Sequence, residues 1–192
     1  FSVVSPANGI RIVGGGGHIR FTDENASLID GGSNGTGLII HSVGDRGGTP
    51  GAITVTTNGT VKGHLGGINA ANKGTGDLVI TADGDISPSG GRGITAANFT
   101  GGGNLVISTG AGSEISGYAH GIYAHNMGDG NLEITANGKV TSETATGIIA
   151  GITGTGTGKL IIVTGEGSEV SGARGIYAKN ANGTGLEITA NG

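Results

Sequence analysis

The sequence contains no cysteine and no tryptophan, only three proline residues, and few aromatic or charged residues, at 3% and 12%. Without cysteine, the chain can form neither a disulfide framework nor a thiolate metal site. No apolar run approaches the ~20 residues with which a helix spans a bilayer. The net charge is −4 and the ten lysine and arginine residues form no run, so we expect no nucleic acid as a partner.

Glycine, by contrast, makes up 45 of the 192 residues. A chain with so much glycine and no periodicity would be a disordered linker. Isoleucine, leucine and valine nevertheless recur at fixed spacing, which a linker has no reason to keep. Glycine does not occupy every third position, so collagen is excluded. We therefore expect a folded chain whose glycine residues form turns.

A six-residue pattern, Gly-Ile-x-Ala-x-Asn, recurs along the chain, although its fourth copy lacks the asparagine. The isoleucines of the five copies are 26, 28, 26 and 28 residues apart. They are Ile68, Ile94, Ile122, Ile148 and Ile176. A fixed period of this length is typical of stacked repeat proteins.

Each repeat contains three short strand-like pieces separated by glycine-rich corners. The first has two apolar residues two apart, as in Leu105-x-Ile107, which share one face of a strand. The second has one apolar residue, such as Val140, and the third is the Gly-Ile-x-Ala piece. Pairs such as Asn137-Gly138, which tolerate positive φ, occupy corners. The pattern predicts an all-β fold, a right-handed parallel β-helix (solenoid) with three strands per turn.

We expect residues 1–192 to form a single β-helix, with irregular turns in 1–50 and regular turns in 51–192. In the irregular part, Leu28 is the predicted inward residue of the second piece, and 45–50 is an insertion. The chain stops part-way through a turn, where an open strand edge needs a cap. We therefore expect a fragment that is truncated at its C-terminal end.

The asparagine of the repeated pattern lies two residues beyond the inward alanine. The four copies that have it supply Asn72, Asn98, Asn126 and Asn180. We expect a structural ladder in which the side-chain amides hydrogen-bond between successive turns, and a ligand role is the alternative. Ile152 interrupts the ladder, so the corner that follows, 153–156, should differ in shape.

A glycine-rich, cysteine-free β-helix of this kind resembles the passenger domains of type V autotransporters, which Gram-negative bacteria secrete. The phrases Gly-Asn-Leu-x-Ile and Gly-Ile-Tyr-Ala-x-Asn particularly resemble Bartonella passengers, and the resemblance covers residues 9–192. It implies secretion or display at the bacterial cell surface, by way of the periplasm and the outer membrane. It also implies a C-terminal outer-membrane β-barrel translocator in the full-length protein. The group includes a secreted agonist of host vascular endothelial growth factor receptors, but the resemblance carries over no receptor-binding residue.

Parallel β-helices also include polysaccharide hydrolases and lyases. A hydrolase needs clustered carboxylates to protonate the glycosidic oxygen and activate water, whereas Asp77, Asp83, Asp85 and Asp129 fall mainly at corners. A turn explains the spacing of Asp83 and Asp85 more simply than calcium binding does. The Gly-Asp-Ser-Gly nucleophile segment of serine proteases is missing. We therefore expect neither an enzyme nor a cofactor.

Unusual side chains gather around the outward positions of the third piece. They are Tyr118, His120, Tyr123, His125, Met127, Ile149, Tyr177 and Lys179. The chain has only three tyrosines and one methionine, and both types are enriched at interfaces. This set is the predicted partner-binding surface, with scattered exposed side chains as the alternative. His120 and His125 have no cysteine or carboxylate pair nearby in the sequence, so we expect no metal there.

These patterns and the resemblance together lead to one expected function and two alternatives. We expect a secreted virulence-factor passenger that binds a host cell-surface protein receptor or matrix by recognition rather than catalysis. Its specific form would be a proangiogenic agonist of a vascular endothelial growth factor receptor. The alternative is an adhesin or self-associating passenger, and a glycan-acting β-helix enzyme comes third. The sequence leaves the oligomeric state open.

Overall fold

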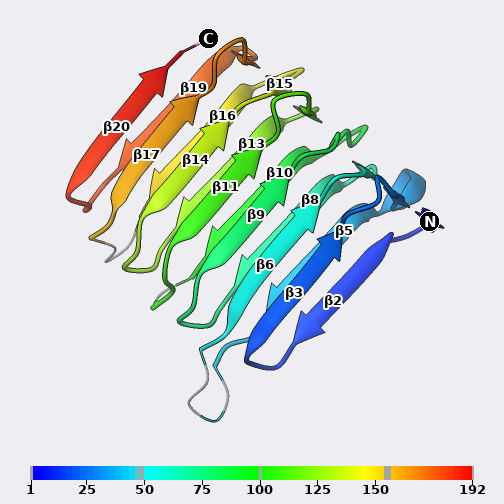
Figure 1. Ribbon diagram of the computed structural model, residues 1–192, viewed down its shortest axis with the longest axis horizontal. Coiled ribbons are helices and arrows are strands. Elements are labelled where there is room, and N and C mark those ends of the chain that lie inside the picture. The colour runs from blue at the N-terminus through cyan, green and yellow to red at the C-terminus, as the bar shows by residue number, and fades with distance from the viewer. Residues whose placement is uncertain (1, 46, 48–49, 100, 154–156, 192) are drawn as a thin grey trace.

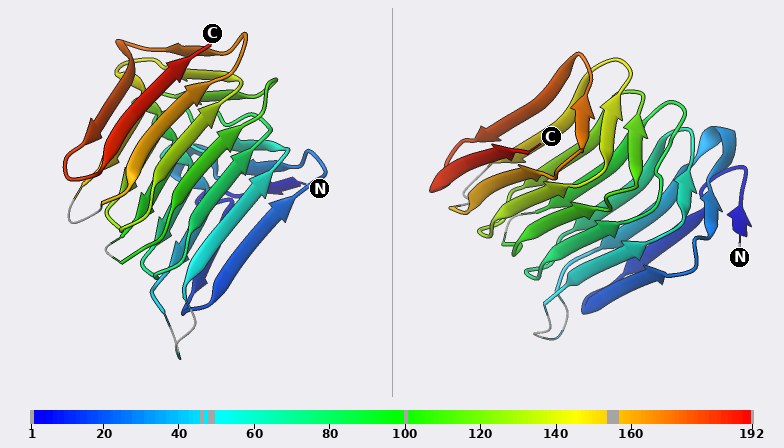
Figure 2. Two further views of the ribbon diagram at one scale, coloured as in Figure 1. Left: turned by 60° about the vertical axis from the view of Figure 1, so that its left-hand side comes forward. Right: turned by 45° about the horizontal axis from the view of Figure 1, so that its top comes forward.

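The computed structural model describes residues 2–45, 47, 50–99, 101–153 and 157–191. In this part of the chain the strands pair in parallel and stack turn upon turn from the N-terminus to the C-terminus (Figure 1). Figure 2 shows the same coil from two further sides. The predicted parallel β-helix is thus confirmed. The one helix of the described residues is the short 3-10 helix η1 (Gly32–Asn34), and no described helix is long and apolar enough to cross a membrane.

Two seven-stranded sheets form two sides of each turn. The β13 sheet contains the Gly-Ile-x-Ala pieces and consists of β2 (Ile10–Gly14), β5 (Thr36–Ser42), β8 (Gly66–Asn72), β10 (Arg92–Asn98), β13 (His120–Asn126), β16 (Thr146–Ile152) and β19 (Arg174–Asn180). The β14 sheet contains the Leu-x-Ile pieces and consists of β3 (His18–Asp23), β6 (Ala52–Thr57), β9 (Leu78–Ala82), β11 (Leu105–Thr109), β14 (Leu132–Ala136), β17 (Lys159–Thr164) and β20 (Gly185–Ala190).

The third side of the turn, here called the β15 side, is made of shorter strands in two groups. The first group is β1 (Ser2–Val4), β4 (Leu28–Asp30) and β7 (Thr60–Lys62); the second is β12 (Glu114–Gly117), β15 (Lys139–Ser142) and β18 (Glu169–Ser171). Between them, Ile86 forms single parallel bridges with Val61 and Ile115. The three predicted pieces of a repeat therefore correspond to the three sides of a turn.

The core is a set of columns in which equivalent residues of successive turns lie side by side. Ile94 pairs with Ile68 on one side and Ile122 on the other, and all three are buried. Because side chains alternate along a strand, the inward position repeats at every turn while its outward neighbours vary. At the N-terminal end the predicted inward residue was wrong by one position. Ile29 pairs with Val61 and is fully buried, whereas Leu28 is only partly buried.

Some glycines, in strands as well as in corners, are required by close packing rather than by positive φ. A Cβ atom at Gly93 would lie 2.5 Å from the carbonyl oxygens of both Gly121 and Ser116. At Gly138 a Cβ atom would collide with the carbonyl oxygen of Ser113 in the preceding turn, yet φ is not positive there. The expectation that Asn-Gly corners need positive φ therefore fails at this corner, because the close approach of successive turns excludes a side chain.

The asparagine ladder stacks in register, but its hydrogen bonds differ from those expected. Asn126 pairs with Asn98, and both side chains are fully buried. The Nδ2 of Asn126 donates to the carbonyls of Gly130 and Asn131 in its own turn, at 2.8 and 3.0 Å, and to that of Gly103 in the preceding turn, at 3.2 Å. The amides thus bind backbone carbonyls of the corners instead of one another. A buried carbonyl needs such a donor, since water cannot reach it.

The other members of the ladder make the same kind of bond. Asn72 donates to the carbonyl of Gly76 at 2.8 Å, and Asn180 donates to that of Gly185 and to that of Gly158 in the preceding turn. Ile152 takes the place of asparagine between Asn126 and Asn180 and is fully buried. The different corner expected after Ile152 includes residues 154–156, which lie outside the described residues.

Of the expected insertion 45–50, residues 46, 48 and 49 likewise lie outside the described residues, but Asp45 is described. Its carboxylate accepts hydrogen bonds from the backbone N of Gly51 and from the N and Oγ1 of Thr75, all at 2.7–2.8 Å. These donors hold the pKa of Asp45 below its usual value, with Gly51 as the largest cause. Asp45 therefore ties this segment to the corner of the next turn.

Candidate partner-binding face

The outer face of the β13 sheet holds most of the predicted partner-binding residues. In β13, Ile122 and Ala124 enter the core, while Tyr123 and His125 point outward. His120, at the start of the strand, also reaches this face, because its ring stacks beside that of Tyr123 with the ring centres 5.7 Å apart. A single strand thus presents three ring side chains on one surface.

Neighbouring strands extend this surface along the axis of the coil. Ile149 lies between Tyr123 and Tyr177 in one column, and Lys179 occupies the same strand position as His125 two turns further on. With strands ~4.8 Å apart, the two tyrosines are about 10 Å apart along the axis. Side chains that are 54 residues apart in the chain are therefore neighbours on one surface.

Three basic side chains surround the ring of Tyr123. The guanidinium carbon of Arg92, on the adjacent strand β10, lies 3.9 Å from the ring centre. The ring of His125 lies 4.6 Å away, and that of His120 completes the group. A guanidinium over an aromatic face is attracted by the electrons of the ring. The contact holds the Arg92 head group against this face.

His125 lies over a gap that the next strand leaves open. A Cβ atom at Gly151 would lie only 3.1 Å from the His125 ring, so a larger side chain there would push against it. The Nε2 atom of His125 is buried and has no hydrogen-bond partner among the described residues. The ring is thus held by packing between Tyr123 and Gly151 rather than by hydrogen bonding at this atom.

Both histidines of the strand favour their neutral form. Burial lowers the pKa of His125, and the positive charge of Arg92 lowers it further. Burial also lowers the pKa of His120, with a smaller contribution from Arg92 and an opposing one from the Thr146 carbonyl, 3.3 Å from its Nδ1. At neutral pH the charge of this group is therefore that of Arg92.

A second tyrosine with basic neighbours lies two turns further along. Arg174 precedes Tyr177 by three residues, and its guanidinium lies 5.9 Å from the ring centre. Lys179 follows by two residues and is exposed, as is Tyr177 at 45%. This arrangement repeats that of His120, Tyr123 and His125 in β13. Both strands thus have the order basic-Gly-Ile-Tyr-Ala-basic.

Two of the predicted residues belong to corners instead of the outer face. Tyr118 lies between β12 and β13, is 46% exposed, and its carbonyl accepts hydrogen bonds from the N and Oγ1 of Thr144 in the next turn. Met127 follows β13 at the opposite end of the strand, where its N donates to the carbonyl of Asn98. Tyr118 therefore lies at the corner before β13 and Met127 at the corner after it, and neither belongs to the outward column of Tyr123.

The prediction did not include Arg92 and Arg174, which contact the two tyrosines. A signal was present in the sequence, because the residue before the repeated Gly-Ile is Gly66, Arg92, His120, Thr146 and Arg174 in successive copies. Strand alternation alone would turn this position inward, two residues before the buried isoleucine. The structure nevertheless places the guanidinium of Arg92 against the outward ring of Tyr123 and that of Arg174 near the ring of Tyr177.

The same face also has a hollow near its N-terminal end. The hollow has a volume of about 330 Å³ and is lined by Arg11, Val13, His41, Ser42, Val43, Ala71, Lys73 and Phe99. The Nζ of Lys73 lies 5.8 Å from the centre of the Phe99 ring, and Val13 and Val43 are exposed. Basic and apolar groups therefore occur together at both ends of the β13 sheet.

Charge is segregated on the surface in a way that the net charge conceals. The seven strands of the β13 sheet contain four lysine or arginine residues and no aspartate or glutamate. They are Arg11, Arg92, Arg174 and Lys179. The rest of the chain has six basic and fourteen acidic residues, a formal charge of −8. The β13 sheet is thus the positive side of a negatively charged protein.

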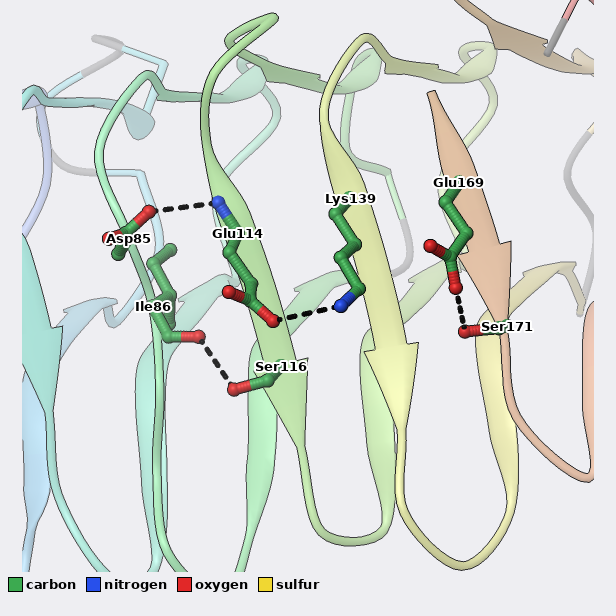
Figure 3. Close-up of polar contacts among 7 residues, drawn as sticks. All are labelled: Asp85, Ile86, Glu114, Ser116, Lys139, Glu169 and Ser171. Atoms are coloured by element: carbon green, nitrogen blue, oxygen red, sulfur yellow. Dashed lines mark hydrogen bonds and ion pairs between the residues drawn. The ribbon is translucent and has the colours of Figure 1, made fainter. Parts of the chain in front are cut away.

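The β15 side has a different character, as Figure 3 shows. Lys139 forms an ion pair with Glu114 at 3.4 Å, and the backbone N of Glu114 donates to Asp85 at 2.9 Å. Within β18, the hydroxyl of Ser171 donates to Glu169. Charges here are matched between adjacent turns, and Asp85 has a structural hydrogen bond. These groups stabilise the stack, as exposed pairs do modestly.

Neither metal-ligand geometry nor a relative indicates a further chemistry. Within the described ranges, no group of three or more histidine, aspartate or glutamate side chains is arranged to hold a metal ion. No known family, curated protein or solved structure matches the chain in three comparisons.

Proposed function

We propose that the chain is a secreted bacterial passenger that binds a host cell-surface protein receptor through the outer face of the β13 sheet. The main support is the pair of tyrosines, Tyr123 and Tyr177, each beside basic side chains on aligned strands. Tyrosine and arginine contribute strongly to binding where they anchor an interface. Their support is a stacked sheet, so binding requires little ordering of the backbone.

The mechanism is recognition by a rigid surface. Ile149 lies between the tyrosines and adds apolar area to the same column. The resemblance of the repeats to Bartonella passengers supports the more specific proposal of a proangiogenic agonist of a vascular endothelial growth factor receptor. Such an agonist acts as a free protein and leads to receptor phosphorylation on endothelial cells.

Binding to purified receptor ectodomains tests this function, with Tyr118 as an internal control. The double variant Tyr123→Ala/Tyr177→Ala should bind at least about 30-fold more weakly, since the loss of even one interface anchor costs about 2 kcal/mol or more. The variant Tyr118→Ala removes a corner tyrosine that is as exposed as Tyr177, and it should bind like the parent chain. Receptor phosphorylation on endothelial cells should follow the same order.

Three outcomes would contradict this function. One is an equal loss of binding in the face and corner variants, and another is the absence of any receptor response to the free protein. The third is concentration-dependent self-association that removes Tyr123 from solvent, which would favour the self-associating passenger instead. Sedimentation velocity at several protein concentrations distinguishes that last case.

A further inference from the structure

We propose that the outer face of the β13 sheet binds a sulfated polysaccharide, a linear polyanion that lies across the strands along the axis of the coil. This ligand is additional to the protein receptor and does not require it. Its recognition uses the basic side chains of the face, whereas the proposed receptor binding is anchored by the tyrosines.

The first support is the absence of negative charge from the face. The strands of the β13 sheet have four lysine or arginine residues and no carboxylate, while the remainder of the chain has a formal charge of −8. A polyanion approaching the protein is therefore repelled by the other sides and attracted by this one. Segregation of this kind favours a ligand whose own charge has a single sign.

The second support is that the basic groups of the face lack carboxylate partners. Among the described residues, the one ion pair within 4 Å joins Lys139 and Glu114 on the β15 side. Arg92 is held against Tyr123 with its guanidinium 3.9 Å from the ring centre. A stacked guanidinium still presents N–H groups along its edge, and this fork fits the oxygens of tetrahedral anions.

The third support is the linear arrangement of the basic positions. Arg92 and Arg174 lie directly before the glycine of the repeated pattern, and Lys179 lies two residues beyond Tyr177. The neutral rings of His120 and His125 occupy the same two lines, where an imidazole N–H can donate a hydrogen bond. The two lines run along the axis, because equivalent residues of successive turns are stacked. Arg92 and Arg174 lie three strands apart, which at ~4.8 Å spacing is about 14 Å, and Arg11 on β2 extends the basic positions to about 29 Å along the axis. An extended chain of sulfated sugars contacts both lines, as a compact anion would not.

Immobilised heparin is the probe for this ligand, and desulfated, N-acetylated heparin, which keeps the uronate carboxylates but has no sulfate groups, is its control. The face variant Arg92→Gln/Arg174→Gln/Lys179→Gln removes three charges from the β13 sheet. The matched variant Arg20→Gln/Lys62→Gln/Lys159→Gln removes three exposed charges from the other two sides. Both variants have the same net charge, so they differ only in where the charges were lost. Their thermal unfolding should coincide with that of the parent chain.

The parent chain should bind heparin, and the face variant should bind at least about tenfold more weakly, because hydrogen bonds to charged groups are the strong ones. The matched variant should remain within about twofold of the parent, as expected of exposed groups outside a contact. The affinity of the parent should fall steeply with salt, and the salt dependence should be shallower in the face variant, because it releases fewer counterions.

Several results would overturn this inference. They are no binding of the parent chain to heparin, equal losses in the two variants, and equal binding of desulfated heparin. Binding of poly-glutamate as tightly as heparin would also overturn it, and would indicate an acidic polypeptide instead. A receptor ectodomain without glycosaminoglycan chains separates the two proposals. If that ectodomain binds while heparin does not, the glycan inference alone fails; the reverse result removes only the protein receptor.

Discussion

The guanidinium of Arg92 lies 3.9 Å from the centre of the Tyr123 ring, although the two residues are 31 positions apart in the chain. Their strands, β10 and β13, are adjacent in the β13 sheet. The contact brings a permanent positive charge beside two partly buried histidines. An arginine of one turn thereby lowers the pKa of two histidines in the next turn, and this effect can be measured.

Removing the charge of Arg92 should raise the pKa of both His120 and His125. The variant Arg92→Gln keeps a polar side chain of similar length but no longer repels the protonated imidazoles. Burial is the larger cause of both shifts, so the pKa values should rise without reaching the usual value of 6.5. NMR titration of the imidazole signals measures this change.

The matched control for that titration is Arg174→Gln, which removes the same charge from β19, two strands away from β13. We expect the His125 titration to be unchanged in it. If both variants shifted His125 equally, or neither did, the local effect of Arg92 would be contradicted.

The stability of the chain should fall as the pH decreases below about 6.5. The folded-state pKa values of His120 and His125 lie below the usual 6.5, so the unfolded chain binds protons first. Their contribution is complete above 6.5 and is lost as the pH falls toward the folded-state values. The charged group Arg92 faces both rings and adds to this trend. Denaturant unfolding between pH 7.5 and pH 5 measures it.

The double variant His120→Gln/His125→Gln should have a shallower pH dependence over this interval. An unchanged slope in the double variant would show that other groups are responsible.

The strand glycine that precedes the stacked isoleucine should be important for stability. In Gly93→Ala the new Cβ atom would lie 2.5 Å from two backbone carbonyl oxygens, those of Gly121 and Ser116. The turns must separate locally to admit it, and we expect a loss of about 2–4 kcal/mol in the free energy of unfolding. Chemical denaturation measures the loss.

Gly112→Ala provides the comparison, because no heavy atom lies within 4 Å of a Cβ atom there and its φ is not positive. We expect a change of no more than about 0.5 kcal/mol. An equal change in the free energy of unfolding for the two substitutions would contradict this prediction, because it would show that the close contacts at Gly93 do not exclude a Cβ atom.

The architecture could be predicted because the same short pattern of apolar residues recurs at a fixed period along the chain. Isoleucines equivalent to Ile94 and Ile107 recur in other turns. Apolar side chains that recur every 26–28 residues are all buried together only if the turns stack. The inward positions followed from strand alternation, which has a strict period of two. At Leu28 and Ile29 the short strand β4 has too few residues to fix that phase, and the prediction was wrong by one position.

The sequence by itself thus determined the period, the columns of the core and the tyrosines on the outer face. Only the tertiary structure decided that Tyr118 and Met127 belong to corners, that the ladder amides bind carbonyls, and that Arg92 reaches Tyr123. These contacts join successive turns, where the partner lies about one repeat away and its direction depends on how each corner packs. The same stacking gathers four scattered basic residues into one carboxylate-free face, because charge on a surface depends on which residues become neighbours.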